Sequence, residues 1–235
     1  MQLPHPLVEG RLLRRYKRFL ADVALDDGTE ITAHVANPGA MTGLRELGSR
    51  VWLSRSNDPK RKLAYSWELV EADATLVGVN ANRPNTIAAE ALEAGGIPEL
   101  AGYGNLRREV KYGKNSRVDL LLTDPEDARR VCYVEVKNVH LRRRERLAEF
   151  PDSVTARGAK HLEELAAMVD DGARAAMLYV VQREDCDRLG VARDIDPRYA
   201  TAMDAAVARG VEIYVHACRV STTAIELDRR LPFEL

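Results

Sequence analysis

The segment CYVEVKNV, residues 132–139, constrains the fold of this chain more than any other stretch. Its cysteine and valines have the apolar, largely β-branched character of a buried strand, yet it also carries an acid, Glu135, and a base, Lys137. Because side chains alternate faces along a strand, we expect Glu135 and Lys137 on one face and the valines on the other. The valines concerned are Val134, Val136 and Val139. Two charges on such a strand indicate a functional site.

A second apolar run, SRVDLLL, carries Asp119 upstream of this strand. The intervening TDPED favours a turn, so a hairpin would bring Asp119 beside Glu135. Two adjacent carboxylates repel each other unless a divalent cation or a lysine compensates them. Mg²⁺ or Mn²⁺ suits such a set of oxygen ligands. The group therefore predicts metal-dependent phosphodiester cleavage, with Asp119 and Glu135 as metal ligands and Lys137 acting on the attacking water.

Plainer explanations exist for these charged residues. Glu135 and Lys137 could form cross-strand ion pairs on a solvent-facing strand, which would contribute only a few tenths of a kcal/mol. A helix expected from Thr86 to Ala94 places Glu90 beside its apolar face. Glu90 is therefore either a third metal ligand or an ordinary surface glutamate.

The first third of the chain predicts a small barrel. Short alternating segments are separated by turn residues such as Asp26-Asp27-Gly28, which is typical of antiparallel strands and hairpins. The clearest segments are Phe19 to Leu25, Ile31 to Val35, Arg50 to Ser54 and Leu63 to Glu71. About five short strands favour an OB-like β-barrel. The Gly-, Asn- and Pro-rich stretch GVNANRPN then predicts a boundary, with domains at 1–83 and 84–235.

The second part alternates helices and strands. After the helix at 86–94, strands are expected at 106–112, 117–122 and 131–136, a helix at 155–169 and a buried strand at 175–181. Asp196 and Pro197 are typical of a helix start, and Gly210 of its end. The predicted order is αβββαβ, followed by a further helix and two late strands. The fold class is therefore α/β, or α+β overall, with a mixed sheet behind the barrel.

Clusters of basic residues predict contacts with nucleic acid. The formal net charge is only −1, so DNA contacts would have to come from such local clusters. Tyr16 and Phe19 lie among the first cluster, and stacking rings among basic groups suit single strands or distorted duplexes. The alternatives are solvated basic faces and, for Lys160, an i,i+4 pair with Glu164. The candidate DNA-binding residues are Arg14, Arg15, Lys17, Arg18, Lys60, Arg61, Lys62, Arg157 and Lys160.

Composition narrows the class of protein. With 235 residues, of which 46% are hydrophobic, the chain can bury the core of one large domain or two small ones. No apolar run approaches the roughly 20 residues of a membrane-spanning helix. The three cysteines are too far apart for zinc-site spacing and fit reduced thiols in a cytoplasmic protein. Oligomeric state, a homodimer included, is left open.

Six segments together resemble the sugar fermentation stimulation protein A family. These are ANPGAMTGL, EALEAGGIPEL, REVKYGKNSRVDLLL, CYVEVKNV, FPDSVTARGAKHLEEL and IDPRYATAMDAAVARGVEIY. The resemblance implies an OB-like domain followed by a domain similar to the PD-(D/E)XK nucleases, which are restriction-endonuclease-like. It also implies DNA binding and a regulatory link to sugar, especially maltose, metabolism.

Residue by residue, the resemblance assigns the motif to the site already singled out. Asp119 looks like its first acid, Glu135 its second acid and Lys137 its lysine. Val118 stands where the name of the motif has proline, which is not a ligand. Three functions remain: a Mg²⁺-dependent DNA endonuclease with Glu90 as an extra ligand, a non-catalytic DNA-binding regulator, and a scaffold for a protein partner.

Overall fold

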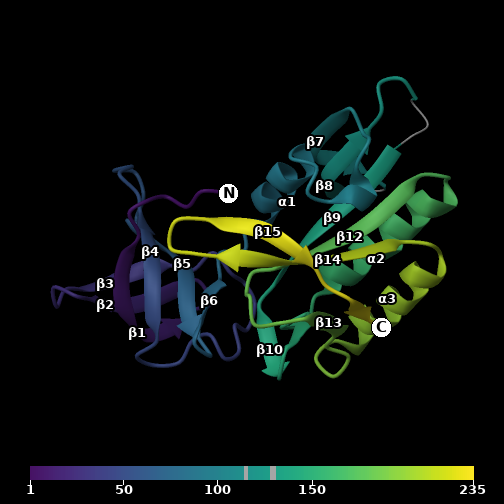
Figure 1. Cartoon of the computed structure of the whole chain (residues 1–235). Coiled ribbons are helices and arrows are strands. Elements are labelled where there is room, and N and C mark those ends of the chain that lie inside the picture. Colours follow the sequence, from purple (N-terminus) through teal and green to yellow (C-terminus); the bar gives the residue numbers. More distant parts are fainter. Residues whose placement is uncertain (114–115, 128–130) are drawn as a thin grey trace.

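The computed structural model describes residues 1–113, 116–127 and 131–235. A β-barrel forms one end of the molecule and a mixed sheet covered by helices forms the other (Figure 1). The last strand of the barrel region ends at Gly78 and the next helix begins at Pro84, on either side of the predicted boundary.

The barrel is closed by five strands. They are β1 (Val8–Tyr16), β2 (Leu20–Leu25), β3 (Glu30–His34), β4 (Arg50–Arg55) and β5 (Tyr65–Ala72), with β6 (Thr75–Gly78) added beside β5. The order is β3-β2-β1-β4-β5-β6, and β3 pairs in parallel with β5 to close the ring. Its core includes Leu12, Val23 and Trp67, which are fully buried. The predicted OB-like barrel is therefore confirmed.

Strand β1 is the barrel strand that the sequence pattern does not single out. It coincides with the basic segment RLLRRYKRF, where arginines mask the alternation expected of a strand. Only Gly10 and Leu12 are fully buried along it. Gly10 allows close packing, because an added Cβ would lie 2.6 Å from a methyl group of Val23.

The second part is built on a six-stranded mixed sheet. Its order is β15-β14-β12-β9-β8-β7, in which β12 runs parallel to both β9 and β14. The strands are β7 (Asn105–Tyr112), β8 (Ser116–Thr123), β9 (Val131–Val139), β12 (Arg174–Val181), β14 (Glu212–Val220) and β15 (Ile225–Arg230). The predicted mixed sheet is confirmed.

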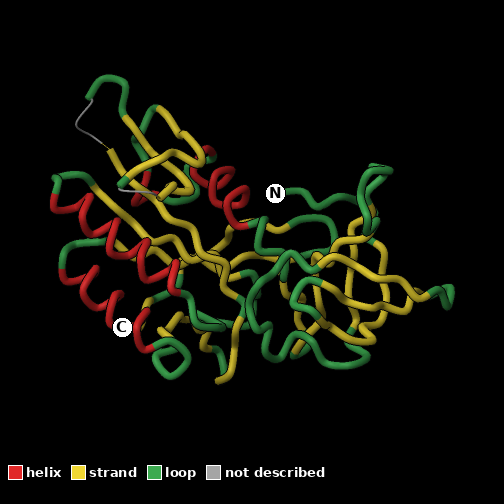
Figure 2. Tube along the Cα trace, turned by 180° about the vertical axis from the view of Figure 1, so that it is seen from behind, coloured by secondary structure: helices red, strands yellow, loops and turns green. Residues whose placement is uncertain are grey.

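Helices cover both faces of this sheet. Helix α1 (Pro84–Glu93) packs on one face, and α2 (Ala156–Asp170) and α3 (Pro197–Ala208) pack on the other (Figure 2). Thr155 caps α2 by accepting the Gly158 amide. Asp196 caps α3 as predicted, and its second carboxylate oxygen accepts the Thr155 amide at 2.7 Å. One carboxylate therefore fixes the start of both helices.

Four short strands form a separate sheet that the sequence does not predict. They are β10 (Leu141–Arg144), β11 (Leu147–Phe150), β13 (Arg188–Val191) and β16 (Phe233–Glu234), in that order; a short 3₁₀ helix, η1, spans Pro98–Leu100. Strands β10 and β11 lie between β9 and α2. The predicted order αβββαβ therefore carries an inserted hairpin after its third strand.

The predicted division of faces along β9 is wrong for one valine. Val134 and Val136 pack in the cluster beneath α1, as expected. Val139, however, packs in the cluster beneath α2 and α3, the face on which Glu135 meets α2. The reason is the two-residue period itself, since positions 135, 137 and 139 share a face.

The segment that joins the two parts is bonded to the barrel. Glu68, 1% exposed, accepts hydrogen bonds from Asn80 at 2.9 Å and from Arg83 at 2.6 and 3.0 Å. A backbone bond from the Gly78 amide to the Gln182 carbonyl adds a direct link between β6 and the second part. The connection is therefore part of the packed structure.

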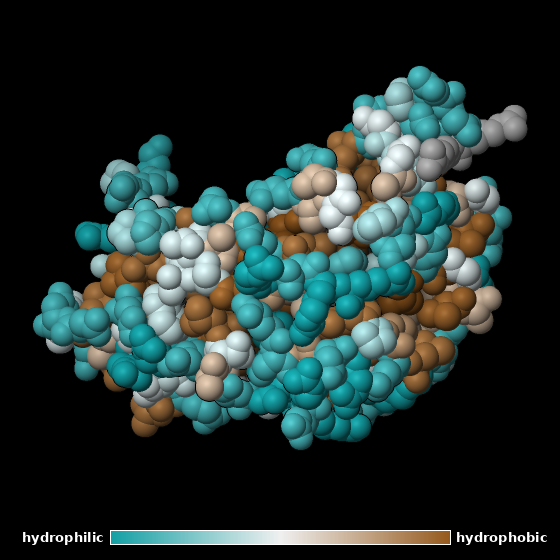
Figure 3. All heavy atoms as spheres, in the orientation of Figure 1, coloured by the Kyte–Doolittle hydropathy of each residue, from teal (hydrophilic) through white to brown (hydrophobic). Residues whose placement is uncertain are grey.

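Ion pairs make a second link across the junction. Asp73, in the turn after β5, pairs with Arg142 at 2.7 Å and with Arg183 at 3.2 Å. Arg183 is 1% exposed and also donates to Asp185 at 2.6 Å and to the His140 carbonyl at 2.9 Å. Hydrophilic side chains cover much of this middle region on the face seen in Figure 3.

Candidate active site

Asp119 and Glu135 lie on neighbouring antiparallel strands. The β8–β9 pairing ends at Leu120 and Val134, so Asp119 and Glu135 are the next residues along. Beyond this point a side chain replaces a backbone carbonyl as the acceptor: Asp119 Oδ2 accepts the Val136 amide at 2.8 Å. Its Oδ1 accepts from Asn85 Nδ2 at 2.8 Å. Both oxygens of Asp119 are thus held by donors from other elements.

Glu135 is buried and asymmetrically bonded. Only 2% of it is exposed, and its Oε1 accepts from Lys137 Nζ at 2.6 Å and contacts His161 Nδ1. Its Oε2 is also buried and has no protein partner in the described chain. The side chain of Lys137 is 15% exposed. Strand β9 is therefore not a solvent-facing strand with surface ion pairs.

The pKa values of the two carboxylates are shifted in opposite directions. Burial raises the pKa of Asp119, and the nearby charge of Glu135 raises it further. Burial alone would also raise the pKa of Glu135, but Lys137 and His161 outweigh it and hold that pKa below its usual value. The site thus carries charge on Glu135 readily, whereas charge on Asp119 calls for a compensating cation.

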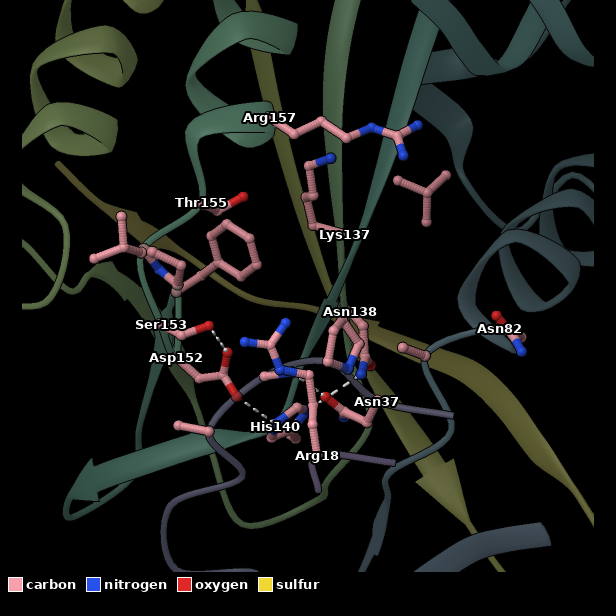
Figure 4. Close-up of a pocket in the computed structure, with 18 of the residues that line it drawn as sticks. Arg18, Asn37, Asn82, Lys137, Asn138, His140, Asp152, Ser153, Thr155 and Arg157 are labelled. Atoms are coloured by element: carbon pink, nitrogen blue, oxygen red, sulfur yellow. Dashed lines mark hydrogen bonds and ion pairs between the residues drawn. The ribbon is translucent and has the colours of Figure 1, made fainter. Parts of the chain in front are cut away.

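A cleft of about 1030 Å³ contains these groups and is lined by both parts of the molecule. In Figure 4, Lys137 and Arg157 lie toward one end of it, and Arg18, His140 and Asp152 toward the other. The barrel contributes the β1–β2 turn and the loop after β3. The catalytic candidates therefore lie in a cleft between the barrel and the mixed sheet.

The basic residues of β1 and its turn have different surroundings. Lys17 and Arg18 line the cleft. Arg15 also lines it, but its guanidinium donates to the carbonyls of Arg18, Asn37, Gly39 and Ala40. Arg15 therefore holds the loops together. Arg14 is not a lining residue; it pairs with Asp22 at 2.8 Å.

Of the other predicted DNA contacts, the structure brings Arg157 to the cleft. Arg157 donates to His161 Nε2 at 3.2 Å. Lys160 pairs instead with Glu164 at 3.5 Å, the alternative given by the sequence. The loop after β4, with Lys60, Arg61 and Lys62, contributes no residue to the lining of the cleft.

Glu90 is not brought to the two carboxylates. It is half exposed on α1, where it pairs with the N-terminal ammonium of Met1 at 2.8 Å. It is absent from the cleft lining. Although Glu90 flanks the apolar face of its helix as expected, the face of the sheet beneath α1 is the one opposite Glu135.

Sequence reasoning did not assign a role to four polar residues of the cleft. His161 contacts Glu135, and Asn85 holds Asp119. His140 Nε2 lies 3.2 Å from Asp152 Oδ2, which also accepts the Met41 amide from the barrel at 3.1 Å. The available signals were the basic, His-containing start of α2 and the asparagine in the first turn of α1.

Asp152 stabilises the contact between barrel and mixed sheet. Gly39 packs so closely on it that an added Cβ would lie 2.3 Å from a carboxylate oxygen. Burial alone would raise the pKa of Asp152, but the hydrogen bond and charge of His140, with the Met41 amide, lower it to about 2. Because 2 is below the usual value of 3.8, ionised Asp152 stabilises the fold at pH above 4.

This stabilisation is expected to fade as the pH falls from 4 toward 2. Between pH 5 and pH 3, the wild type should lose about 1 kcal/mol more unfolding free energy than Asp152→Asn, which cannot ionise. Urea unfolding at both pH values measures the difference. Equal losses in the two proteins would contradict the assignment, and Asp58→Asn on the exposed loop after β4 serves as the matched control.

Two family models match the chain in succession. The model of the SfsA N-terminal OB domain matches residues 13–79, and that of the sugar fermentation stimulation protein RE domain matches residues 82–224. The chain belongs to the sugar fermentation stimulation protein family. The resemblance seen in the sequence is thereby confirmed.

Relatives match over almost the full length. The sugar fermentation stimulation protein homolog of Rhodospirillum centenum is 63% identical over 231 residues, covering 98% of each chain. The homolog of Maricaulis maris is 57% identical over 235 residues, covering 100% of this chain and 99% of its own. A solved structure of Pyrococcus furiosus SfsA in complex with Ca²⁺ matches with a TM-score of 0.88 at 25% identity, covering 100% of this chain and 98% of that one.

Among the described residues of this family member, no helix is long and apolar enough to cross a membrane. The same residues contain no cluster of three or more His, Cys, Asp or Glu side chains arranged to hold a metal.

Proposed function

We propose that this protein is a metal-dependent DNA nuclease, with Asp119 and Glu135 as ligands of Mg²⁺ or Mn²⁺. The observation that carries the proposal is the unpartnered, buried Oε2 of Glu135 beside a second, partly buried carboxylate, that of Asp119. A buried charged oxygen without a partner is costly, and a cation or a water bound to a cation removes that cost.

The donor set fits a hard divalent cation. Mg²⁺ commonly uses one or two carboxylates and retains several waters, which two carboxylates and an open cleft allow. The Ca²⁺ complex of the Pyrococcus furiosus relative supports the use of a divalent ion. Such an ion, when bound, would polarise the phosphate and supply a water of lowered pKa.

The other residues of the site act by position and charge. Lys137 Nζ lies 2.6 Å from Glu135 Oε1, where its remaining donors can orient an attacking water. Arg157, at the start of α2, adds charge for a phosphate from the same end of the cleft. Lys17 and Arg18 supply charge from the barrel wall. DNA backbone spanning both parts would meet cations on each side.

A non-catalytic DNA-binding regulator, linked to sugar metabolism in the family name, is the second candidate. The contacts that favour it are those of Glu135 with Lys137 and His161, which already compensate one carboxylate without a metal. Such a protein would bind DNA in the same cleft and leave it intact.

The direct test is incubation of the purified protein with single-stranded, duplex, branched and mismatched DNA. We expect cleavage with Mg²⁺ or Mn²⁺ and none with EDTA. Intact DNA under every metal condition, combined with salt-sensitive binding, would reject the nuclease and favour the regulator. If the protein neither cleaves nor binds any of these DNAs, both candidate functions are rejected.

A further inference from the structure

The three-residue turn between β1 and β2, Lys17–Phe19, has an unusual conformation. Lys17 and Arg18 both have positive φ, 46° and 64°. This region is common for glycine and asparagine but disfavoured for long side chains, and such residues concentrate at ligand-binding sites. Here the result is that two cations lie at the tip of a hairpin that lines the cleft.

The conformation is held by Arg15. One of its nitrogens, Nη2, donates to the carbonyl of Arg18 at 2.8 Å, and to those of Asn37 and Gly39 at 2.9 Å. The turn is thus fixed to the loop after β3. Lys17 and Arg18 themselves make no side-chain hydrogen bond or ion pair among those seen in the described structure.

An exposed aromatic ring completes the turn. Phe19 follows Arg18 directly and is 43% exposed, although its backbone is bonded to Lys17 and Val35. The other phenylalanines differ, because Phe150 and Phe233 pack against Tyr179. A ring left in solvent beside two free cations is the combination that binds an unpaired base and its phosphates.

We propose that the turn Lys17–Phe19 binds a single nucleic-acid strand, stacking a base on Phe19 and pairing phosphates with Lys17 and Arg18. The inference rests on the proposed function, since a nucleic-acid strand bound at this turn would lead into the cleft of Asp119 and Glu135. Bases of a duplex are stacked on one another and do not offer a free face. A cleft of about 1030 Å³ is also at the upper end of small-ligand pockets, which suits a short single strand.

Binding of fluorescein-labelled oligonucleotides in EDTA tests the proposed single-strand binding by the turn without any cleavage. The probes are dT₁₀, rU₁₀ and a DNA duplex of ten base pairs, each followed by anisotropy. Both single strands should bind more tightly than the duplex. Phe19→Ala should weaken single-strand binding roughly 5- to 150-fold, whereas Phe19→Tyr should retain it. Leu47→Ala, which removes another exposed apolar side chain of the barrel, should change nothing.

A second measurement addresses the cations. Each of Lys17→Gln and Arg18→Gln should make the negative slope of log affinity against log salt shallower by about 0.7. Tighter duplex binding, an unchanged affinity of Phe19→Ala, or unchanged salt slopes would overturn the proposal. Because EDTA excludes metal-dependent chemistry, these results stand apart from those of the nuclease test. The preferred sugar, deoxyribose or ribose, would identify the strand as DNA or RNA.

Discussion

Asp119→Asn is expected to lower metal-dependent DNA cleavage roughly 10²- to 10⁴-fold. The substitution removes the negative charge of a proposed metal ligand, and charge stabilisation by a catalytic ion contributes several kcal/mol to the transition state. Single-strand binding in EDTA should stay within about twofold of wild type, since the cations of the cleft are untouched. Initial rates at saturating Mn²⁺ provide the measurement.

Folding of this variant should be nearly unchanged. Asparagine keeps one acceptor oxygen, so one donor, Asn85 or the Val136 amide, loses its partner at a cost of about 1 kcal/mol. Relief of the repulsion with Glu135 offsets that cost, because the raised pKa of Asp119 means that its charge destabilises the fold. Asp26→Asn, in an exposed hairpin, is the matched control. Full activity of Asp119→Asn would refute the metal assignment.

Arg183→Met should destabilise the protein by about 3 kcal/mol, which corresponds to a fall of roughly 6–12 °C in Tm. Arg183 is among the largest fully buried side chains, and its loss removes two hydrogen bonds from Asp185, which keeps its ion pair with Arg142. Removing one partner of a buried ion pair costs more than the pair contributes, because a charge remains in a low-dielectric surrounding. Thermal unfolding by circular dichroism measures the change.

A surface ion pair supplies the comparison for Arg183. Arg219, 66% exposed, pairs with Asp228 at 2.8 Å on the hairpin of β14 and β15. Arg219→Met should alter stability by less than about 1 kcal/mol. Similar effects of the two substitutions would mean that the network at the junction does not stabilise the fold.

Periodicity and turn chemistry predicted much of this architecture. The strand bearing Glu135 was recognisable because β-branched residues alternate with charges, and α3 because Asp196 and Pro197 mark its start. The four short strands were missed because segments of two to four residues contain too little alternation to detect. Strand β1 was hidden by its arginines.

The candidate site was predictable in part for a related reason. Asp119, Glu135 and Lys137 lie on adjacent or identical strands, so local sequence determines that they meet. His161 reaches Glu135 only because α2 packs on that face, which depends on tertiary structure. Likewise, Glu90 lies on α1, whose apolar residues pack on the sheet. The spacing of residues within that helix does not reveal which face of the sheet it covers.

The bonded junction has a consequence for how a ligand enters. Glu68 fixes the connecting segment through Asn80 and Arg83, and Asp73 fixes the barrel to Arg142 and Arg183. The aperture between the two halves is therefore set when the chain folds. A nucleic-acid strand that binds as we propose would thread into this aperture rather than be enclosed by a closing movement. Little binding free energy would then be spent on ordering the two halves. Because the aperture is fixed, ends and unpaired tails of a nucleic acid would have access that the middle of a rigid duplex lacks.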